Sequence, residues 1–405
     1  MKFIHCADLH LDQPFQGLGK LSSAFSNKLV DVNAQVFNSL IETAIEERVD
    51  FLLIVGDTFH QAKPSIQTQQ LFVSGLEKLN QEGIPVYLTF GNHDYYQAEK
   101  YWFKFPKNTY LFNSEEIETK TLSLPSGETV AISAFSYTSP KIMANKASEF
   151  PTRSIISQYH IGLYHGQVGR VNDHPYAPFQ LGELQQLNYD YWALGHIHQP
   201  QLLSNEPLII YPGSPVGHTK KETASRGCVL VENQGNTLKE SWLELTDLIW
   251  ETVVVDGRSA TSLANLMAIT EIQLKEFMQS QELLTCLEVQ FQNLPAELAS
   301  LVKEELASGE LLLYLRELVA VGTDHQVWLY QVSSDIAVKP MQWPVGITKE
   351  MVLNQAMTYA EAEMFAGELS DLFKQSELQH LFSNNQDFIN ETIDKTVRHL
   401  GMTED

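Results

Sequence analysis

The chain has 405 residues, 43% of them hydrophobic and 19% charged, which fits a globular protein of two or more domains. With 27 basic and 50 acidic side chains its formal net charge is −23, so it lacks the basic composition of a typical nucleic-acid binder. Residues 251–405 hold 24 of the acids and only 9 of the bases, so a nucleic-acid substrate would have to be held mainly by metal ions or by a partner's positive surface.

No run of 18 apolar residues occurs, so we expect no transmembrane helix and no membrane partner. The stretch at residues 1–8 is too short for a signal peptide, and it already contains an acidic residue at Asp8. The three cysteines, Cys6, Cys228 and Cys286, lie far apart and form no CxxC pair. This pattern favours a reducing, cytoplasmic location.

In the first half of the chain, short apolar runs alternate with patterns of helical periodicity. We expect buried strands at 2–7, 51–55 and 86–90, separated by helices at 23–47 and 67–81. This order predicts parallel strands joined by helical crossovers. So many strands indicate two sheets, because further strands are expected near 117–123, 128–134, 158–164, 190–194, 207–211, 227–232 and 237–244.

After residue 248 the pattern changes to that of a smaller unit. We expect a strand at 250–256, a helix at 259–277, a strand at 283–292, and then a helix and a strand within 299–330. Residues 348–400 are typical of two amphipathic helices. The chain is therefore expected to divide into a first domain at 1–247, a capping domain at 248–345 and a helical C-terminal arm at 346–405.

Ten of the 13 histidines lie within the first 218 residues, most of them directly after an expected strand. Open α/β sheets place their ligand sites at such strand ends. Any single block of this kind is weak evidence for a metal site, but five in order are not expected by chance. The five are Asp8-Leu9-His10, Gly56-Asp57-Thr58-Phe59-His60, Gly91-Asn92-His93-Asp94, His165-Gly166 and Gly195-His196-Ile197-His198.

Aspartate, asparagine and histidine together suit Mn²⁺, Fe²⁺ or Zn²⁺, because imidazole and carboxylate match metals of intermediate softness. The alternate spacing of Asp8 with His10, and of His196 with His198, directs both side chains of each pair to one side of an extended segment. Two cations about 3.5–4 Å apart can activate a water and polarise a phosphoryl group. Holding them that close needs a shared carboxylate, and Asp57 is the expected bridge.

The five blocks together resemble the calcineurin-like metallophosphoesterase superfamily. Gly56-Asp57-Thr58-Phe59-His60 is similar to the Gly-Asp-x-Phe-His block of SbcD-type DNA-repair nucleases. Phosphoprotein phosphatases carry Asp-Arg-Gly after this point, where this chain has Gln61-Ala62-Lys63. The segments 10–18, 176–179 and 190–198 resemble the YhaO-like branch of those nucleases. The resemblance is specific over residues 1–232 and only general beyond residue 250.

This resemblance implies a four-layer α/β/β/α sandwich with a small α/β capping domain and a helical arm. His93 would face the scissile phosphate, Asp94 would orient His93, and His60 would help to position the substrate backbone. Two divalent ions, Mn²⁺ before Fe²⁺ or Zn²⁺, would be held as follows: one by Asp8, His10, Asp57 and His198, the other by Asp57, Asn92, His165 and His196.

Several histidines have plainer interpretations. His60 could pack behind the site without touching substrate, and His5 is expected to be a satisfied core histidine. His174 is left out of the metal set. The loop 211–218 is similar to the family's Pro-Gly loop, but His218 stands where relatives often carry an arginine, which would weaken contact with phosphate. The histidines outside any block, expected on the surface or in the core, are His160, His218, His325, His380 and His399.

We therefore expect a Mn²⁺-dependent phosphodiesterase that hydrolyses DNA, as an exonuclease or endonuclease in DNA repair. SbcD-like nucleases work with an ABC-type coiled-coil ATPase and commonly pair with a second copy. This chain has no GxxxxGK[ST] loop, so the ATPase would be a separate, SbcC-like polypeptide. The acidic residues 348–400 are the expected docking element for it.

Two alternatives stay open. A phosphodiesterase or phosphatase of small nucleotides would use the same two-metal site; the acidic composition favours it, whereas the His60 block and the capping domain favour DNA. A non-catalytic scaffold would be expected to have lost ligands, and none of the seven expected ligand positions is lost.

Overall fold

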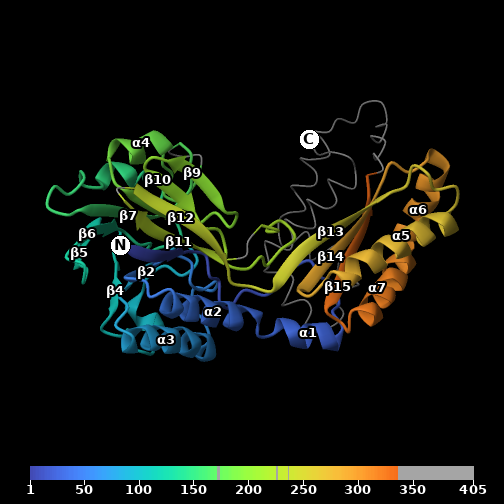
Figure 1. The fold of residues 1–405 in the computed structure, drawn as a ribbon, viewed down its shortest axis with the longest axis horizontal. Helices are drawn as coiled ribbons and strands as arrows, with labels where there is room; N and C mark the ends of the chain where they lie inside the picture. The colour runs from blue at the N-terminus through green and yellow to red at the C-terminus, as the bar shows by residue number, and fades with distance from the viewer. Residues whose placement is uncertain (171–173, 225–226, 236, 336–405) are drawn as a thin grey trace, which may run out of the picture. The chain divides into compact units, whose positions relative to one another are not determined.

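The computed structural model describes residues 1–170, 174–224, 227–235 and 237–335. Its first part contains two mixed six-stranded sheets (Figure 1). In spatial order the first consists of β12 (Thr237–Glu244), β11 (Gly227–Gln234), β1 (Lys2–Cys6), β2 (Phe51–Val55), β3 (Val86–Thr89) and β4 (Thr109–Leu111). The second consists of β5 (Glu118–Ser123), β6 (Thr129–Ala134), β7 (Tyr159–His165), β8 (Tyr191–Gly195), β10 (Leu208–Tyr211) and β9 (Gln201–Asn205).

Parallel pairing brings the expected site residues to common edges. In the first sheet β1, β2, β3 and β4 run parallel, as the helical crossovers predict. In the second sheet β6, β7, β8 and β10 run parallel, and β5 and β9 close its sides as antiparallel strands. Every residue of β2 is buried, as expected for a central strand that is covered on both faces. The blocks after β1, β2 and β3 therefore lie at one edge.

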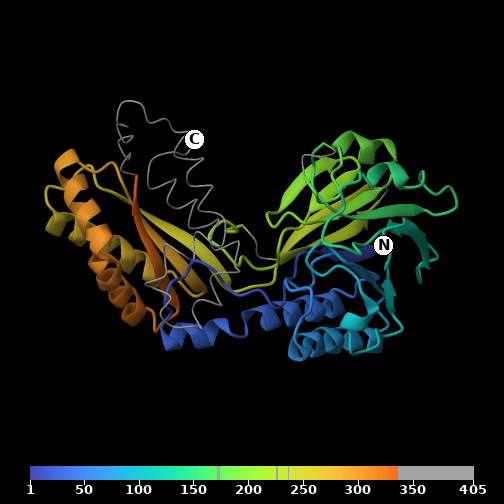
Figure 2. The same cartoon turned by 180° about the vertical axis from the view of Figure 1, so that it is seen from behind.

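The two sheets pack face to face, and helices cover their outer faces. Phe3 and Phe51 of the first sheet stack with ring centroids 4.8 Å apart, and the Phe3 ring meets Tyr191 of the second sheet edge-on at 5.2 Å. Helices α2 (Val32–Glu46) and α3 (Ile66–Gln81) pack on the first sheet, while α4 (Leu181–Gln186) packs on the second. Seen from behind, α2 and α3 lie on the opposite side of the sheets from α4 (Figure 2). This confirms the four-layer α/β/β/α sandwich.

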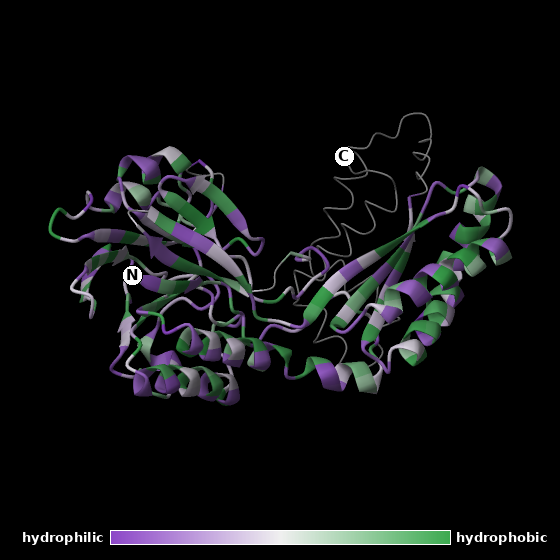
Figure 3. Cartoon of the chain, viewed as in Figure 1, coloured by the Kyte–Doolittle hydropathy of each residue, from purple (hydrophilic) through white to green (hydrophobic). Residues whose placement is uncertain are grey.

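The helices on the first sheet follow the amphipathic pattern of their sequence. Hydrophobic and hydrophilic residues are interspersed along α2 and α3 (Figure 3). The buried residues of each helix are mostly apolar and belong to the core that includes the first sheet. Helix α3 begins where Ser65 caps it, because the Ser65 hydroxyl accepts a hydrogen bond from the Thr68 N–H. Among the described helices, none combines the length and apolar character that crossing a membrane requires.

A third sheet follows, with helices packed against it. It consists of the parallel strands β13 (Leu248–Asp256), β14 (Leu284–Gln292) and β15 (Val327–Ser334). Its helices are α5 (Leu263–Gln279), α6 (Ala296–Ser308) and α7 (Glu310–Gly322). The boundaries 1–247 and 248–345 stay a prediction, and the expected arm at 346–405 lies outside the described residues.

The helix expected at 23–47 is wrong as a single element. The chain forms α1 (Ser23–Leu29) and then α2, with a break at Val30 and Asp31. The two helices bury their apolar faces against different sheets: α1 places Phe25 against Trp328 of β15, with ring centroids 5.8 Å apart, whereas α2 packs on the first sheet. The break falls at Asp31, a residue type common at helix starts, although its side chain makes no capping hydrogen bond here.

Other elements also differ from the expectations. The helix expected at 259–277 begins only at Leu263, because Ser262 accepts a hydrogen bond from the Asn265 N–H and caps it. The single helix expected within 299–330 is two helices, because Gly309 between them has a φ of +78° and ends α6. The strands β4 and β9 and the short helices η1 (Ala98–Lys100) and η2 (Ala147–Glu149) were not expected.

Candidate metal centre

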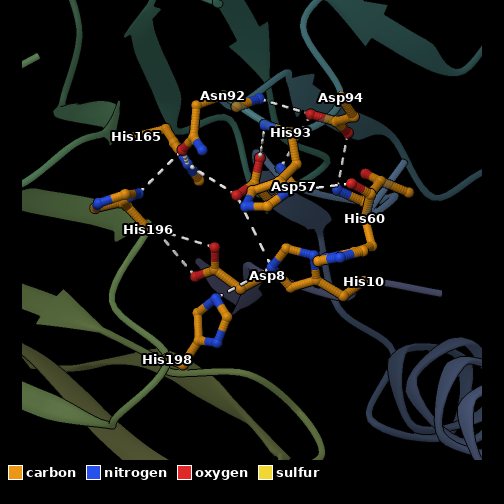
Figure 4. A network of polar contacts seen from close by, with 12 residues as sticks. Asp8, His10, Asp57, His60, Asn92, His93, Asp94, His165, His196 and His198 are labelled. Carbon is orange, nitrogen blue, oxygen red and sulfur yellow. Dashed lines mark hydrogen bonds and ion pairs between the residues drawn. The ribbon is translucent and has the colours of Figure 1, made fainter. Parts of the chain in front are cut away.

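The structure brings together all ten residues expected from the five blocks. The segments that follow β1, β2 and β3 approach those that follow β7 and β8, so the two sheets contribute to one site. Figure 4 shows these side chains pointing toward one another; they are Asp8, His10, Asp57, His60, Asn92, His93, Asp94, His165, His196 and His198.

One group of donors surrounds the Asn92 side chain. The Asn92 Oδ1 atom lies 3.2 Å from His165 Nε2 and 3.0 Å from His196 Nδ1. The Asp57 Oδ2 atom lies 3.4 Å from the same His165 nitrogen. Oxygen and nitrogen donors from both sheets thus converge on one small volume.

A second group of donors surrounds His10. The Nε2 atoms of His10 and His198 lie 3.1 Å apart. Asp8 lies beside them, and one possible ligand atom from each of these three residues lies within 4.8 Å of the other two. Asp57 Oδ2 lies 3.9 Å from His10 Nε2. The same carboxylate oxygen therefore faces both groups, as expected of a bridging ligand.

The site carries buried charge that a pair of cations would balance. Asp8 and Asp57 are buried, and burial raises the pKa of Asp8 to about 6. Burial alone would lower the pKa of the His165 imidazole, but the Asp57 carboxylate raises it to about 9. These donors and buried carboxylates fit two divalent cations of intermediate softness.

Four of the expected ligands adopt a left-handed backbone conformation that is unusual for residues other than glycine. The φ values are 53° for Asp8, 42° for His10, 50° for Asp57 and 99° for His196. Each such residue costs on the order of 1–3 kcal/mol, and strain of this kind gathers at functional sites. The turns are held by backbone hydrogen bonds such as His10 N–H to the Asp57 carbonyl, 3.0 Å.

Three glycines enclose the His165 ring. A Cβ atom at Gly56 would lie 2.2 Å from His165 Nδ1, and one at Gly195 would lie 2.7 Å from the same nitrogen. At Gly91 a Cβ would lie 2.2 Å from Asp57 Oδ1 and 2.6 Å from His165 Nε2. His165 Nδ1–H donates to the Val55 carbonyl at 3.0 Å, so Nε2 is left with a lone pair for a metal. The glycines of these three blocks therefore make room for the His165 imidazole.

His93 lies beside the His10 group. Its backbone N–H donates to Asp57 Oδ1 at 2.9 Å, and its Nδ1 atom lies 3.0 Å from the His60 carbonyl oxygen. The His93 ring stacks on His60 with centroids 4.8 Å apart and meets His10 edge-on at 5.1 Å. The Asp12 carboxylate in turn accepts the His60 N–H at 2.6 Å, so the His60 backbone is itself held in place.

The hydrogen bonds of Asp94 go to backbone groups of the site, and its expected role in orienting His93 stays a prediction. The buried Asp94 carboxylate accepts backbone N–H bonds from Asp57, Thr58 and Gly91, at 3.2, 2.8 and 2.7 Å. It therefore joins the loops after β2 and β3 and sets the position of Asp57, while the His60 carbonyl orients His93. Burial and the neighbouring Asp57 charge raise the pKa of Asp94 to about 7.

One partner of the site, Glu222, had no signal in the sequence. Glu222 Oε1 lies 3.1 Å from His198 Nδ1, and Glu222 Oε2 accepts the His218 backbone N–H at 2.7 Å. His218 is buried, and its Nε2 lies 3.0 Å from Asn33 Oδ1. A carboxylate on the far nitrogen of a metal-binding histidine fixes its tautomer and its orientation. Glu222 belongs to no histidine block, which is why the sequence did not reveal it.

His5 is a core histidine, as expected. Its Nδ1 lies 2.9 Å from the Tyr191 hydroxyl and its Nε2 lies 3.0 Å from the Leu194 carbonyl oxygen. His160, which belongs to no block, is also buried and satisfied, with Nε2 2.8 Å from Ser133 Oγ.

Comparisons with known proteins agree with this geometry. The family model of the calcineurin-like phosphoesterases matches residues 1–200. The chain is 35% identical over 273 residues, 67% of each protein, to the uncharacterized metallophosphoesterase YhaO of Bacillus subtilis. It is 24% identical to the SbcD component of the SbcCD nuclease of B. subtilis, over 60% of this chain and 69% of that protein. It is 25% identical to the DNA double-strand break repair protein Mre11 of Methanocaldococcus jannaschii, over 61% of this chain and 67% of that protein.

The substitution Gly91→Ala should disrupt metal binding. The added methyl group would displace the Asp57 carboxylate and the His165 ring, so we expect Mn²⁺ affinity to fall at least about 10-fold. Elemental analysis and calorimetry of the purified variant would measure this loss. Gly182→Ala is the matched control, because a Cβ there meets nothing within 4 Å. Normal Mn²⁺ binding by Gly91→Ala would contradict the described packing.

The substitution Glu222→Gln should weaken one of two Mn²⁺ binding steps. Without its carboxylate partner His198 is held less firmly, so we expect affinity in that step to fall about 10- to 100-fold. The other step should change less, because Glu222 makes no contact with Asn92, His165 or His196. Calorimetric titration separates the steps, with the exposed Glu82→Gln as control. Two unchanged binding steps would remove Glu222 from this role.

Proposed function

Because the chain belongs to the calcineurin-like phosphoesterase family, we propose that it is a two-metal phosphodiesterase that hydrolyses DNA with Mn²⁺. The observation that carries the proposal is the position of Asp57 Oδ2, which lies 3.4 Å from His165 Nε2 and 3.9 Å from His10 Nε2. Similarity to a nuclease component and to a DNA double-strand break repair protein supports DNA as the substrate.

The proposed ligands divide between the two groups of donors. Bound cations would polarise the phosphoryl group and stabilise charge on the attacking and leaving oxygens. One ion would be held by Asp8, His10, Asp57 and His198, and the other by Asp57, Asn92, His165 and His196.

His93 is the proposed catalytic residue that is not a ligand. Its backbone N–H is used by Asp57, and its Nδ1 faces the His60 carbonyl, so Nε2 is the ring atom left to meet the substrate. From there the imidazole can neutralise charge on the phosphoryl oxygens or protonate the leaving oxygen. His60 contributes its carbonyl to this orientation, and its ring is proposed to contact the substrate backbone.

The acidic composition of the chain bears on its partners. We propose that a separate SbcC-like ABC ATPase works with this chain and supplies positive surface for DNA. The relation to one component of a two-part nuclease supports this assignment. The three cysteines are buried and unpaired, which agrees with a reducing, cytoplasmic location.

The substrate assignment can be tested with purified, Mn²⁺-loaded protein on linear duplex DNA and on a chromogenic phosphodiester. We expect both to be hydrolysed, a chelator to abolish the activity, and added Mn²⁺ to restore it, because the proposed site requires cations. Strong turnover of the chromogenic diester without any DNA cleavage would instead establish the small-nucleotide phosphodiesterase.

The substitution His93→Ala should lower kcat about 10²- to 10⁴-fold, the usual contribution of a positioned acid. Metal content should stay near two ions per chain, because Asp57 is contacted by the His93 backbone and not by its ring. Activity assays together with elemental analysis measure both quantities. His325→Ala, in the segment after α7, is the control and should retain activity. Loss of metal in His93→Ala would show that the assignment of His93 is wrong.

A further inference from the structure

The segment directly after the Gly91-Asn92-His93-Asp94 block differs from the rest of the chain in its residue types. Residues 95–107 contain six aromatic side chains and three lysines, with Glu99 as their one acid. No acidic side chain occurs between Lys100 and Ser114, although acids outnumber bases 50 to 27 in the whole chain. A positive, aromatic segment thus adjoins the proposed catalytic centre.

Most of the aromatic rings in this segment form a support, and one is presented to solvent. Tyr101, Phe103 and Phe105 pack on one another with centroids 5.0–5.8 Å apart and against the hydrophobic core. Trp102 is 53% exposed, and its ring meets the Phe103 ring edge-on at 5.9 Å. About half of the indole surface therefore stays free on a packed support, so its ring can stack against a ligand.

The buried side chain of Gln69 holds this segment against the loop that carries His60. The Gln69 Nε2 group donates to the carbonyls of Pro64 and Lys100, at 3.1 and 3.2 Å, and Oε1 accepts the Trp102 N–H at 3.4 Å. One amide therefore joins the backbone of Trp102 to the segment four residues after His60.

A ring contact brings the same two segments together. The Phe59 and Tyr101 rings lie 6.5 Å apart between centroids, and these residues are the direct chain neighbours of His60 and Trp102. The indole is thus placed on a fixed support that is joined to the loop carrying His60.

Cationic side chains accompany the exposed indole. Lys104 and Lys107 are exposed on the same segment, and Lys63 is exposed on the loop after His60. Lys100 is used differently, because its Nζ lies 3.3 Å over the Tyr95 ring and donates to the Tyr95 carbonyl. An exposed aromatic ring together with lysines is the combination that binds unpaired nucleotides, through stacking on the base and attraction to the phosphates.

We propose that Trp102, with Lys104 and Lys107, binds an unpaired stretch of DNA next to the scissile phosphate. This rests on the proposed function and narrows its substrate to DNA with single-stranded character, such as a frayed end or an overhang. The bases of such a stretch are not held in the stack of a duplex, so the indole can stack on the free face of one of them. Every base has an aromatic face that can stack on the indole, so binding would depend little on the DNA sequence. The protein would then select DNA that is single-stranded over DNA that is paired.

The test compares DNA binding by full-length, Mn²⁺-loaded proteins that all carry His93→Ala to prevent cleavage. Fluorescence anisotropy is measured with labelled oligothymidylate and with a blunt duplex. Adding Trp102→Ala should weaken single-strand binding about 5- to 100-fold, the effect of one lost stacking contact, and duplex binding far less. Trp102→Phe should restore most of the affinity. Replacing Lys104 and Lys107 by Gln should reduce the salt dependence of single-strand binding by about 0.7 per lysine.

Trp242→Ala is the matched control, because Trp242 is 43% exposed on β12 and belongs to neither loop; it should bind like the parent protein. Equal single-strand affinity of the parent and the Trp102→Ala protein would overturn this inference while leaving the proposed function intact. A Trp102→Ala protein that loses self-association but keeps its DNA affinity would overturn it too, and would assign the surface to a second copy of the chain. If the parent protein binds Mn²⁺ but no DNA of either form, the proposed function and this inference both fall.

Discussion

The site depends on keeping two carboxylates, Asp8 and Asp57, buried close to several imidazoles. Burying a carboxylate away from water costs several kcal/mol unless other charges and hydrogen bonds offset it. Asp57 has such partners on both sides, since Oδ2 faces His165 and His10 while Oδ1 accepts the His93 N–H. The left-handed turns, the glycines around His165 and the Asp94 carboxylate all act to keep this one side chain in its place.

The sequence predicted the parts of the fold and of the site that local pattern controls. Buried strands such as β2 and the histidine blocks behind them are visible because the apolar run and the polar turn are contiguous in the chain. The break at Val30 and Asp31 was missed, because the apolar pattern continues through it while Phe25 of the first helix packs on a tryptophan about 300 residues away in sequence. Short strands such as β4 lack a long enough apolar run to be recognised.

The backbone partners of Asp94 were not predicted, for a related reason. Its neighbour in sequence, His93, suggested a carboxylate–imidazole pair, but its partners are backbone N–H groups, which every residue other than proline possesses and no sequence motif can mark. Glu222 was missed because its partner His198 is distant in the chain. In both cases the sequence showed the side chains that could bind a metal, while the groups that orient them are determined by three-dimensional packing.

Each group of donors draws its members from both sheets. Asp8 and His10 follow a strand of the first sheet and His198 follows a strand of the second, and the same division separates Asn92 from His165 and His196. Ions bound there would act as cross-links between the two halves of the sandwich, in addition to the apolar contacts between the sheets. A ligand that binds only the folded chain stabilises it in proportion to the logarithm of its free concentration. The cohesion of the sandwich would then depend on the supply of metal, and starvation for metal would loosen the edge at which the sheets meet.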